Sequence, residues 1–364
     1  MKKFILIIII IVLSLNLLSI NSIALDIDVD SVWNEIDSQT KEYLEDLGIN
    51  EISFGDLFDL NPTRVIEFLI DISLNSGIKV FNNIIQIITI LFIISIASAF
   101  LKESDRIQNI ICFVGVLTVL SVVLVPISRM ITDVATGIKT SMIFVNSYLP
   151  VMVAIIVASR NPSLAVTYNS FTIFLSSVIT TVSDKLFIPC ISSILSFNIL
   201  SSFSFENFRE RIVAGFKRCI KVVLALFSTV YTGLLTTQSI LASSSDSIAL
   251  RGIKFISGAF VPVVGAGVGD ALSSVFSSFI IMKNTLGVFV IIVIILINLP
   301  VMTELLIWYF SLEMCSIISS MLGINNITDT LDSLSSVISI LNIILFFVTF
   351  VLVISTGVII MMGK

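Results

Sequence analysis

The sequence contains no histidine among its 364 residues, and only 12% of the residues are charged. Histidine is the commonest general base and metal ligand, so Ser-His-Asp, Cys-His and histidine–zinc chemistries are excluded. Soluble domains carry about 25% charged residues, so this chain lacks the polar surface that a water-soluble body requires. With 56% hydrophobic residues and a mean hydropathy of +1.11, it is predicted to be an all-α, polytopic membrane protein.

Cysteine is also scarce. The four cysteines are Cys112, Cys190, Cys219 and Cys315, and no two of them have CxxC spacing. None lies in the acidic N-terminal segment, where an oxidising compartment would favour a disulfide. We expect all four to be buried apolar side chains, and the sequence predicts no metal or cofactor site.

The formal net charge of −5 is distributed unevenly. Residues 25–79 hold 13 acidic and 3 basic residues, whereas residues 80–364 hold 12 acidic and 15 basic residues. We therefore predict an acidic, extracytoplasmic helical segment over residues 25–78 and a polytopic transmembrane domain over residues 79–364. A segment of about 50 residues forms only a thin core alone, so we expect its helices to pack on the membrane, on the transmembrane body or on a partner.

The first 24 residues resemble a secretory signal peptide. Lys2 and Lys3 precede an apolar run, and Ser22 and Ala24 suit the two small-residue positions of a signal-peptidase site. The alternative is an uncleaved first transmembrane helix, because the apolar run is long enough to span a bilayer. In either case residues 25–78 are predicted to lie outside the cytoplasm.

Uncharged stretches of about 20 residues, the length that crosses a bilayer, recur along the rest of the chain. They are Val80–Leu101, Ile107–Ser128, Thr140–Ser159, Asn161–Ser183, Leu186–Phe205, Val222–Ser245, Asn284–Thr303 and Ser333–Gly363. Two further stretches are ambiguous: Phe255–Met282, which contains Pro262 and Asp270, and Leu305–Thr328, which contains Glu313. Together they predict about 8–9 membrane segments, with Phe255–Met282 as a re-entrant hairpin.

Three expectations concern acidic residues that lie in or beside the ambiguous stretches. Glu304, beside Pro300, is predicted to cap a tight hairpin at the surface, and Glu313 would lie near mid-membrane if its stretch crosses. Asp329 and Asp332 are predicted to lie in an extracytoplasmic loop, which follows from the positive-inside rule when Phe255–Met282 is re-entrant.

The largest basic cluster comprises Arg209, Arg211, Lys217, Arg218 and Lys221. The positive-inside rule places this cluster in the cytoplasm. Its simplest interpretation is a loop that determines topology. The sharper hypothesis is an interfacial helix that docks a cytoplasmic partner or an anionic lipid.

Two stripes of small polar residues follow helical spacing, each opposite an apolar face. One consists of Asp270, Ser273, Ser274, Ser277 and Ser278, and the other of Asp332, Ser335, Ser336 and Ser339. In lipid such a face must meet protein or water. We therefore interpret the stripes as lining a pore or a subunit interface, with ordinary small-residue helix packing as the alternative.

A cluster of helix-breaking residues lies upstream of the first stripe, at Gly258, Pro262, Gly265 and Gly269. Glycines spaced four apart favour close helix packing, whereas a true break marks substrate sites in transporters. A secondary transporter for a small solute, built around residues 255–282, is therefore the alternative function. A membrane enzyme using Asp270 and Glu313 is disfavoured, because acid–base chemistry would rest on these two carboxylates alone.

Phosphate chemistry is not indicated. The nearest approach to a P-loop, Gly137 to Ser141, lacks the contiguous Gly-Lys-Ser/Thr and the upstream glycine. Any ATP hydrolysis is therefore expected from a separate subunit.

The stretch from Leu234 to Gly265 closely resembles the stage III sporulation protein AE family, and the resemblance continues through Lys283 to Phe289. The layout of signal peptide, acidic segment and polytopic body is also similar. The residues that carry the resemblance include Leu250, Arg251, Lys254, Phe255, Lys283, Asn284 and Gly287.

The resemblance implies a non-enzymatic role that composition does not reveal. It implies a core component of a secretion-like channel complex, in the mother-cell membrane around the forespore, that supports late forespore gene expression. The implied partners are other proteins of the stage III sporulation A operon, including a cytoplasmic ATPase and ring-forming subunits, and indirectly stage II sporulation protein Q. Membrane lipid and further copies of the chain are also expected partners, and nucleic acid is not.

Overall fold

A computed structural model of the chain describes residues 30–52, 62–100, 105–159, 162–201, 214–229, 231–233 and 265–361. These residues are helical apart from short turns, and no strand occurs among them. The predicted all-α class is therefore confirmed. The predicted signal peptide lies outside the described residues and stays a prediction.

Two short helices, α2 (Asp30–Asn34) and α3 (Ser38–Asp46), precede the long ones. The carboxylate of Asp37 caps α3 by accepting a hydrogen bond from the backbone N–H of Thr40 at 3.1 Å. After the helix, Gly48 adopts a φ of 85°, the left-handed conformation that commonly terminates helices. A side chain there would be strained and would also meet the guanidinium group of Arg64.

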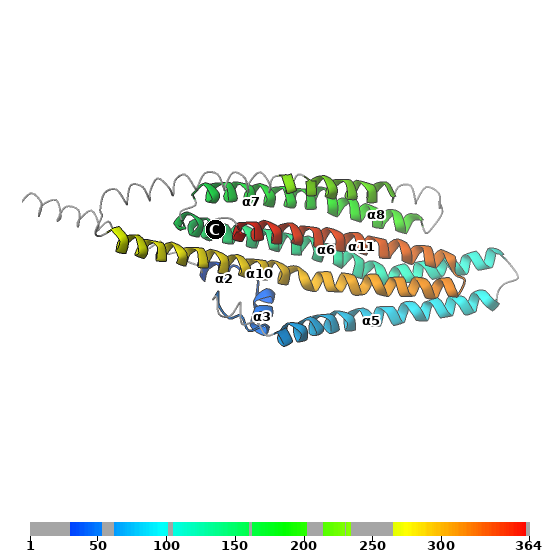
Figure 1. Cartoon of the computed structure of the whole chain (residues 1–364). Coiled ribbons are helices and arrows are strands. Elements are labelled where there is room, and N and C mark those ends of the chain that lie inside the picture. The colour runs from blue at the N-terminus through cyan, green and yellow to red at the C-terminus, as the bar shows by residue number, and fades with distance from the viewer. Residues whose placement is uncertain are drawn as a thin grey trace, which may run out of the picture.

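The body of the molecule is a bundle of long helices. They are α5 (Pro62–Phe100), α6 (Asp105–Ala158), α7 (Pro162–Val182), the π-helical turn η1 (Ser183–Phe187), α8 (Ile188–Ser201), α10 (Gly265–Met321) and α11 (Asn325–Met361). α6, α10 and α11 run side by side through the bundle (Figure 1). α5 lies along α10 on the side where α2 and α3 are found, and α7 and α8 lie on the opposite side.

Several stretches that the sequence pattern assigns to separate crossings lie end to end on one helix. The two predicted crossings between residues 107 and 159 share α6, and those between residues 161 and 205 share the continuous path α7–η1–α8. The predicted breaks between these pairs are wrong, because the helix continues through the charged residues that separate them. With a rise of 1.5 Å per residue, α6 is about 80 Å long, which exceeds the thickness of a hydrocarbon core of about 30 Å.

α10 also continues through predicted breaks. Pro300 lies inside it, so the surface hairpin predicted at Glu304 is wrong. Gly265 is its first residue and Gly269 lies within it, so the described residues 265–282 are helical, and the re-entrant hairpin predicted over residues 255–282 is not confirmed. Gly258 and Pro262, the other two residues of the predicted break, lie outside the described residues.

Asp329 and Asp332 are helical as well. α10 and α11 are joined by a short turn at Gly323, whose φ is 76°, and α11 begins at Asn325. The two aspartates therefore lie in the first turns of α11 and not in the predicted loop.

Five helices in the described part of the chain are long and apolar enough to cross a bilayer. They lie within Thr63–Phe100, Ile110–Ala158, Pro162–Asn198, Phe276–Met321 and Asn325–Ile360. These helices support a multi-pass helical membrane protein, whereas the count of 8–9 segments is not confirmed. The predicted domain boundary after residue 78 falls inside the continuous helix α5.

The core lies where α10 and α11 pack together and against α6. Leu312, Leu331 and Leu334 are fully buried there. Cys315 is buried too, but Cys112 and Cys190 are half-buried and Cys219 is exposed, so the expectation that all four cysteines are buried is confirmed only for Cys315.

Candidate functional site

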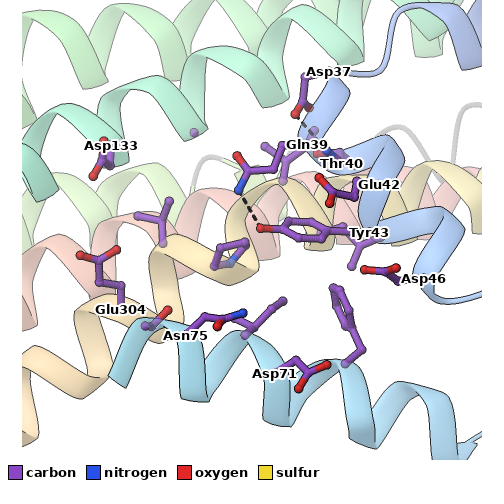
Figure 2. A pocket seen from close by; sticks show the side chains of 18 of the residues that line it. Asp37, Gln39, Thr40, Glu42, Tyr43, Asp46, Asp71, Asn75, Asp133 and Glu304 are labelled. Carbon is purple, nitrogen blue, oxygen red and sulfur yellow. Dashed lines mark hydrogen bonds between the residues drawn. The ribbon is translucent and has the colours of Figure 1, made fainter. Parts of the chain in front are cut away.

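A large acidic cavity lies where the N-terminal helices meet the bundle (Figure 2). Its volume is about 1010 Å³. Four helices line it: α3, the first half of α5, the middle of α6 and the middle of α10 around Pro300. Because a proline lacks the N–H group of a normal helical residue, Pro300 leaves the carbonyl of Leu296, another lining residue, without its usual helical donor.

The lining of this cavity is strongly negative. The two cations are Arg64 and Lys79, and the eight carboxylates are Asp37, Glu42, Glu45, Asp46, Glu67, Asp71, Asp133 and Glu304. Figure 2 shows Asp133 and Glu304 on the bundle side and the labelled acids of α3 on the other side. The cavity therefore disfavours anions and favours positively charged groups by simple charge complementarity.

Aromatic contacts hold the N-terminal helices on the bundle. The ring of Trp33 stacks on Phe289 of α10 with 5.8 Å between centroids, and Tyr43 of α3 meets Phe68 of α5 edge-on at 5.3 Å. Of the three surfaces considered for the acidic segment, the described structure places it on the helical body. The recruitment of Asp133 and Glu304 into the acidic cavity is not visible in the sequence, because each lies more than 50 residues from the other acids.

A second, smaller cavity of about 220 Å³ brings together two predicted clusters. Lys217 and Lys221 come from the helical residues 214–229, and Ser335, Ser336 and Ser339 come from α11. Tyr309 and Glu313 of α10 complete the polar lining. We call this site the lysine–serine cavity. It joins two of the five residues of the predicted docking cluster to three of the four residues of the second predicted serine stripe.

The charges of the lysine–serine cavity are partly unbalanced. Lys217 is half-buried and Lys221 is exposed, and neither makes a salt bridge or hydrogen bond among the described residues. Burial lowers the pKa of Lys217, and the like charge of Lys221 lowers it further. The carboxylate of Glu313, unlike the two lysines, has a described partner: it accepts a hydrogen bond from the hydroxyl of Ser335 at 2.7 Å.

Next to this cavity, α10 and α11 exchange hydrogen bonds reciprocally. Ser335 of α11 donates to Glu313 of α10, while Ser316 of α10 donates to Asp332 of α11. Ser335 is therefore a packing residue with a bonded hydroxyl, which favours the packing interpretation for that position. Ser336 and Ser339 face the cavity instead, and no hydrogen bond from their hydroxyls is described.

The structure does not bring the remaining predicted residues to this site. Arg218 is exposed and does not line the cavity, and Ser277 and Ser278 are exposed near the start of α10, about 50 Å from Glu313 along the helix. Outside the described residues or side chains lie Arg209, Arg211, Leu250, Arg251, Lys254, Phe255, Asp270, Ser273 and Ser274. Residues 137–141 are helical, so no phosphate-binding loop forms there.

The other family-like residues, Lys283, Asn284 and Gly287, lie within α10. Lys283 is buried at 1% exposure, and Asn284 is half-buried with an unpartnered side-chain oxygen. A side chain at Gly287 would place its Cβ 2.5 Å from Cγ1 of Ile360. Only glycine permits this close approach without a shift of Ile360.

Comparison with known proteins identifies the family. The sequence model described as stage III sporulation protein AE matches residues 44–363. The stage III sporulation protein AE of Bacillus subtilis (strain 168) is 31% identical over 155 residues, which are 42% of this chain and 38% of that protein. The match therefore spans well under two thirds of this relative, and no solved structure matches. Because the family model covers most of the chain, this protein belongs to the stage III sporulation protein AE family.

Proposed function

We propose that the protein is a non-enzymatic core component of a sporulation channel complex that links the mother cell with the forespore. Its place is the mother-cell membrane around the forespore, with the N-terminal acidic segment outside the cytoplasm, and its activity supports late forespore gene expression. The family match over residues 44–363 is the observation that carries this proposal. The five apolar helices support the membrane location.

The exposed surface of α5 supports an assembly role. Its second half, from Val80 to Phe100, contains no charged residue, and Phe92, Ile93 and Ile96 are all more than 45% exposed. Such a surface requires lipid or another protein. A component of a larger complex has both available, so α5 is the helix that we assign to contacts with neighbouring subunits or further copies of this chain.

The proposed partners are a cytoplasmic ATPase, the ring-forming subunits of the same operon and, indirectly, stage II sporulation protein Q. The basic residues that do not line the lysine–serine cavity, Arg209, Arg211 and Arg218, are the proposed contact for the ATPase. The acidic cavity has the opposite charge and lies on the side of the N-terminal helices, so the two surfaces suit different partners.

Affinity purification from sporulating cells that encode this chain tests the proposal. The tagged full-length protein should recover the ATPase and the ring-forming subunits, identified by mass spectrometry. Charge reversal by Arg209→Glu with Arg211→Glu should reduce recovery of the ATPase several-fold and leave the ring-forming subunits in place. Recovery of no envelope protein, with the tagged chain present at its normal level, would contradict the proposal.

A further inference from the structure

We infer that the lysine–serine cavity binds the head group of an anionic phospholipid, with phosphatidylglycerol as the best-fitting class. The site requires only a protein in a membrane and does not depend on the protein partners proposed above.

The first argument is charge. Lys217 and Lys221 converge on the cavity from successive turns of one helix, and no described carboxylate forms an ion pair with either. Two adjacent ammonium groups repel each other, and this repulsion adds to the effect of burial, the larger cause of the lowered pKa of Lys217. A phosphate group between them would relieve this repulsion and accept hydrogen bonds from both.

The second argument is the remaining polar lining. Glu313 leaves the site with one net positive charge, so a singly charged anion matches it better than a zwitterion does. The carboxylate of Glu313 can accept hydrogen bonds from the glycerol hydroxyls of such a head group. Ser336 and Ser339 supply hydroxyls that are not used elsewhere among the described residues.

The third argument is the apolar surface that continues from the cavity. Two of its lining helices, residues 214–229 and α11, stay together beyond it: Phe227 packs edge-on against Phe347 at 5.7 Å, and the hydroxyl of Tyr231 donates to the carbonyl of Val351 at 2.8 Å. Large apolar side chains along this path are exposed, namely Val222, Leu226, Ile343, Phe346 and Phe350. Acyl chains can therefore lie along it while the head group occupies the cavity.

The size of the cavity agrees with a head group and not with a whole ligand. Pockets for small molecules usually measure roughly 300–1,000 Å³, and this one measures about 220 Å³. A lipid that places only its phosphate and glycerol inside and leaves its chains on the surface fits this volume. A docked protein segment would find little depth here, so lipid is favoured over a protein for Lys217 and Lys221.

Native mass spectrometry of the full-length protein in mild detergent tests the inference. The protein is exposed to an equimolar mixture of phosphatidylglycerol, phosphatidylethanolamine and phosphatidylcholine. The natural chain should retain phosphatidylglycerol preferentially. The double variant Lys217→Gln with Lys221→Gln should lose roughly tenfold or more of this preference, since each lysine near an anionic lipid contributes about 1 kcal/mol.

A matched control removes two positive charges elsewhere. Arg218→Gln with Lys185→Gln alters two exposed residues, one of them on the same helix, and neither lines the cavity. This variant should retain phosphatidylglycerol like the natural chain. If the first double variant does not fold, Lys221→Gln alone serves, because Lys221 is exposed and its loss should still lower the preference several-fold.

Four results would overturn the inference. The first is that the cavity variant and the control retain phosphatidylglycerol equally, and the second is that the natural chain retains the zwitterionic lipids as well as it retains phosphatidylglycerol. The third is that excess inorganic phosphate releases the lipid completely. The fourth is that a photo-crosslinker at position 221 captures a protein instead of lipid. Release by phosphate would indicate a free-anion site, and capture of a protein would indicate a docking site.

Discussion

Helices α10, α11 and α5 are all apolar, but they are buried to different extents. Half of the residues in the most apolar window of α10 and of α11 are buried, against 17% in α5. α10 and α11 pack on each other and on α6, whereas α5 borders α6 and α10 on one side only. High hydropathy alone therefore does not determine the role of a helix: α10 and α11 form the internal core, and α5 presents apolar surface to lipid or to other subunits.

The largest effect should come from a cavity in the core. Leu312→Ala on α10 removes a fully buried side chain and should destabilise the protein by about 2–4 kcal/mol. Ile93→Ala on α5, where 60% of the side chain is exposed, should cost less than about 1 kcal/mol. Thermal unfolding of both variants in detergent measures the difference. Equal losses would show that α5 is packed as tightly as the core.

Glycine positions provide a second contrast between the two regions. Gly287→Leu forces a side chain against Ile360 and should destabilise the α10–α11 contact by about 1–3 kcal/mol. Gly77→Leu on α5 meets nothing within 4 Å and improves helix propensity, so it should be neutral or slightly stabilising. Size-exclusion profiles and melting temperatures distinguish the two. A neutral Gly287→Leu would mean that the close contact is absent in the membrane.

The smallest effect concerns single hydrogen bonds. A double-mutant cycle with Ser335→Ala and Glu313→Gln should give a coupling of about 0.6 kcal/mol, the average for interhelical bonds in membranes, and at most about 1.7 kcal/mol. Thr89→Ala on α5 removes only a local bond to the carbonyl of Ile85 and should show no coupling to Glu313→Gln. If the cycle through Ser335 also gives no coupling, the reciprocal bonding between α10 and α11 does not stabilise the protein.

Helix starts and the character of the N-terminal segment were predictable from the sequence. Pro62 begins α5, as proline at a first helical position indicates. Val32 and Leu44 lie among apolar residues that recur at helical spacing in the acidic segment, and both are fully buried. These features are local, because caps and amphipathic faces depend on residues within a few turns of each other.

Helix continuity was not predictable in the same way. The charged residues between Arg129 and Lys139 suggest a loop between two crossings, yet Arg, Lys and Thr are tolerated inside helices, and the lone Gly137 does not break α6. The region also packs on α10 and α11, since a Cβ at Gly137 would lie 3.0 Å from Oδ1 of Asn298 and 3.9 Å from Cδ1 of Leu345. A charge count along the chain does not contain that information.

The candidate sites likewise combine features that are local in the sequence with features that depend on tertiary packing. The basic cluster and the serine stripe of α11 each follow from spacing within one helix. That Lys217 and Ser336 share a cavity depends on the packing of helices far apart in the chain. Likewise Asp133 and Glu304 join the acids of α3 only because α6 and α10 line the same cavity as that helix.

The sequence by itself determined the class of this protein: a histidine-free, helical membrane chain with an acidic N-terminal segment, because composition and charge decide which solvent each part can face. The tertiary structure decided which faces meet, which helices continue through charged stretches, and where the two cavities lie. The physical reason is that, beyond their serine stripes, α10 and α11 are apolar on nearly every side, so periodicity does not distinguish a lipid-facing surface from a packed one. Only the contacts with their neighbours do so.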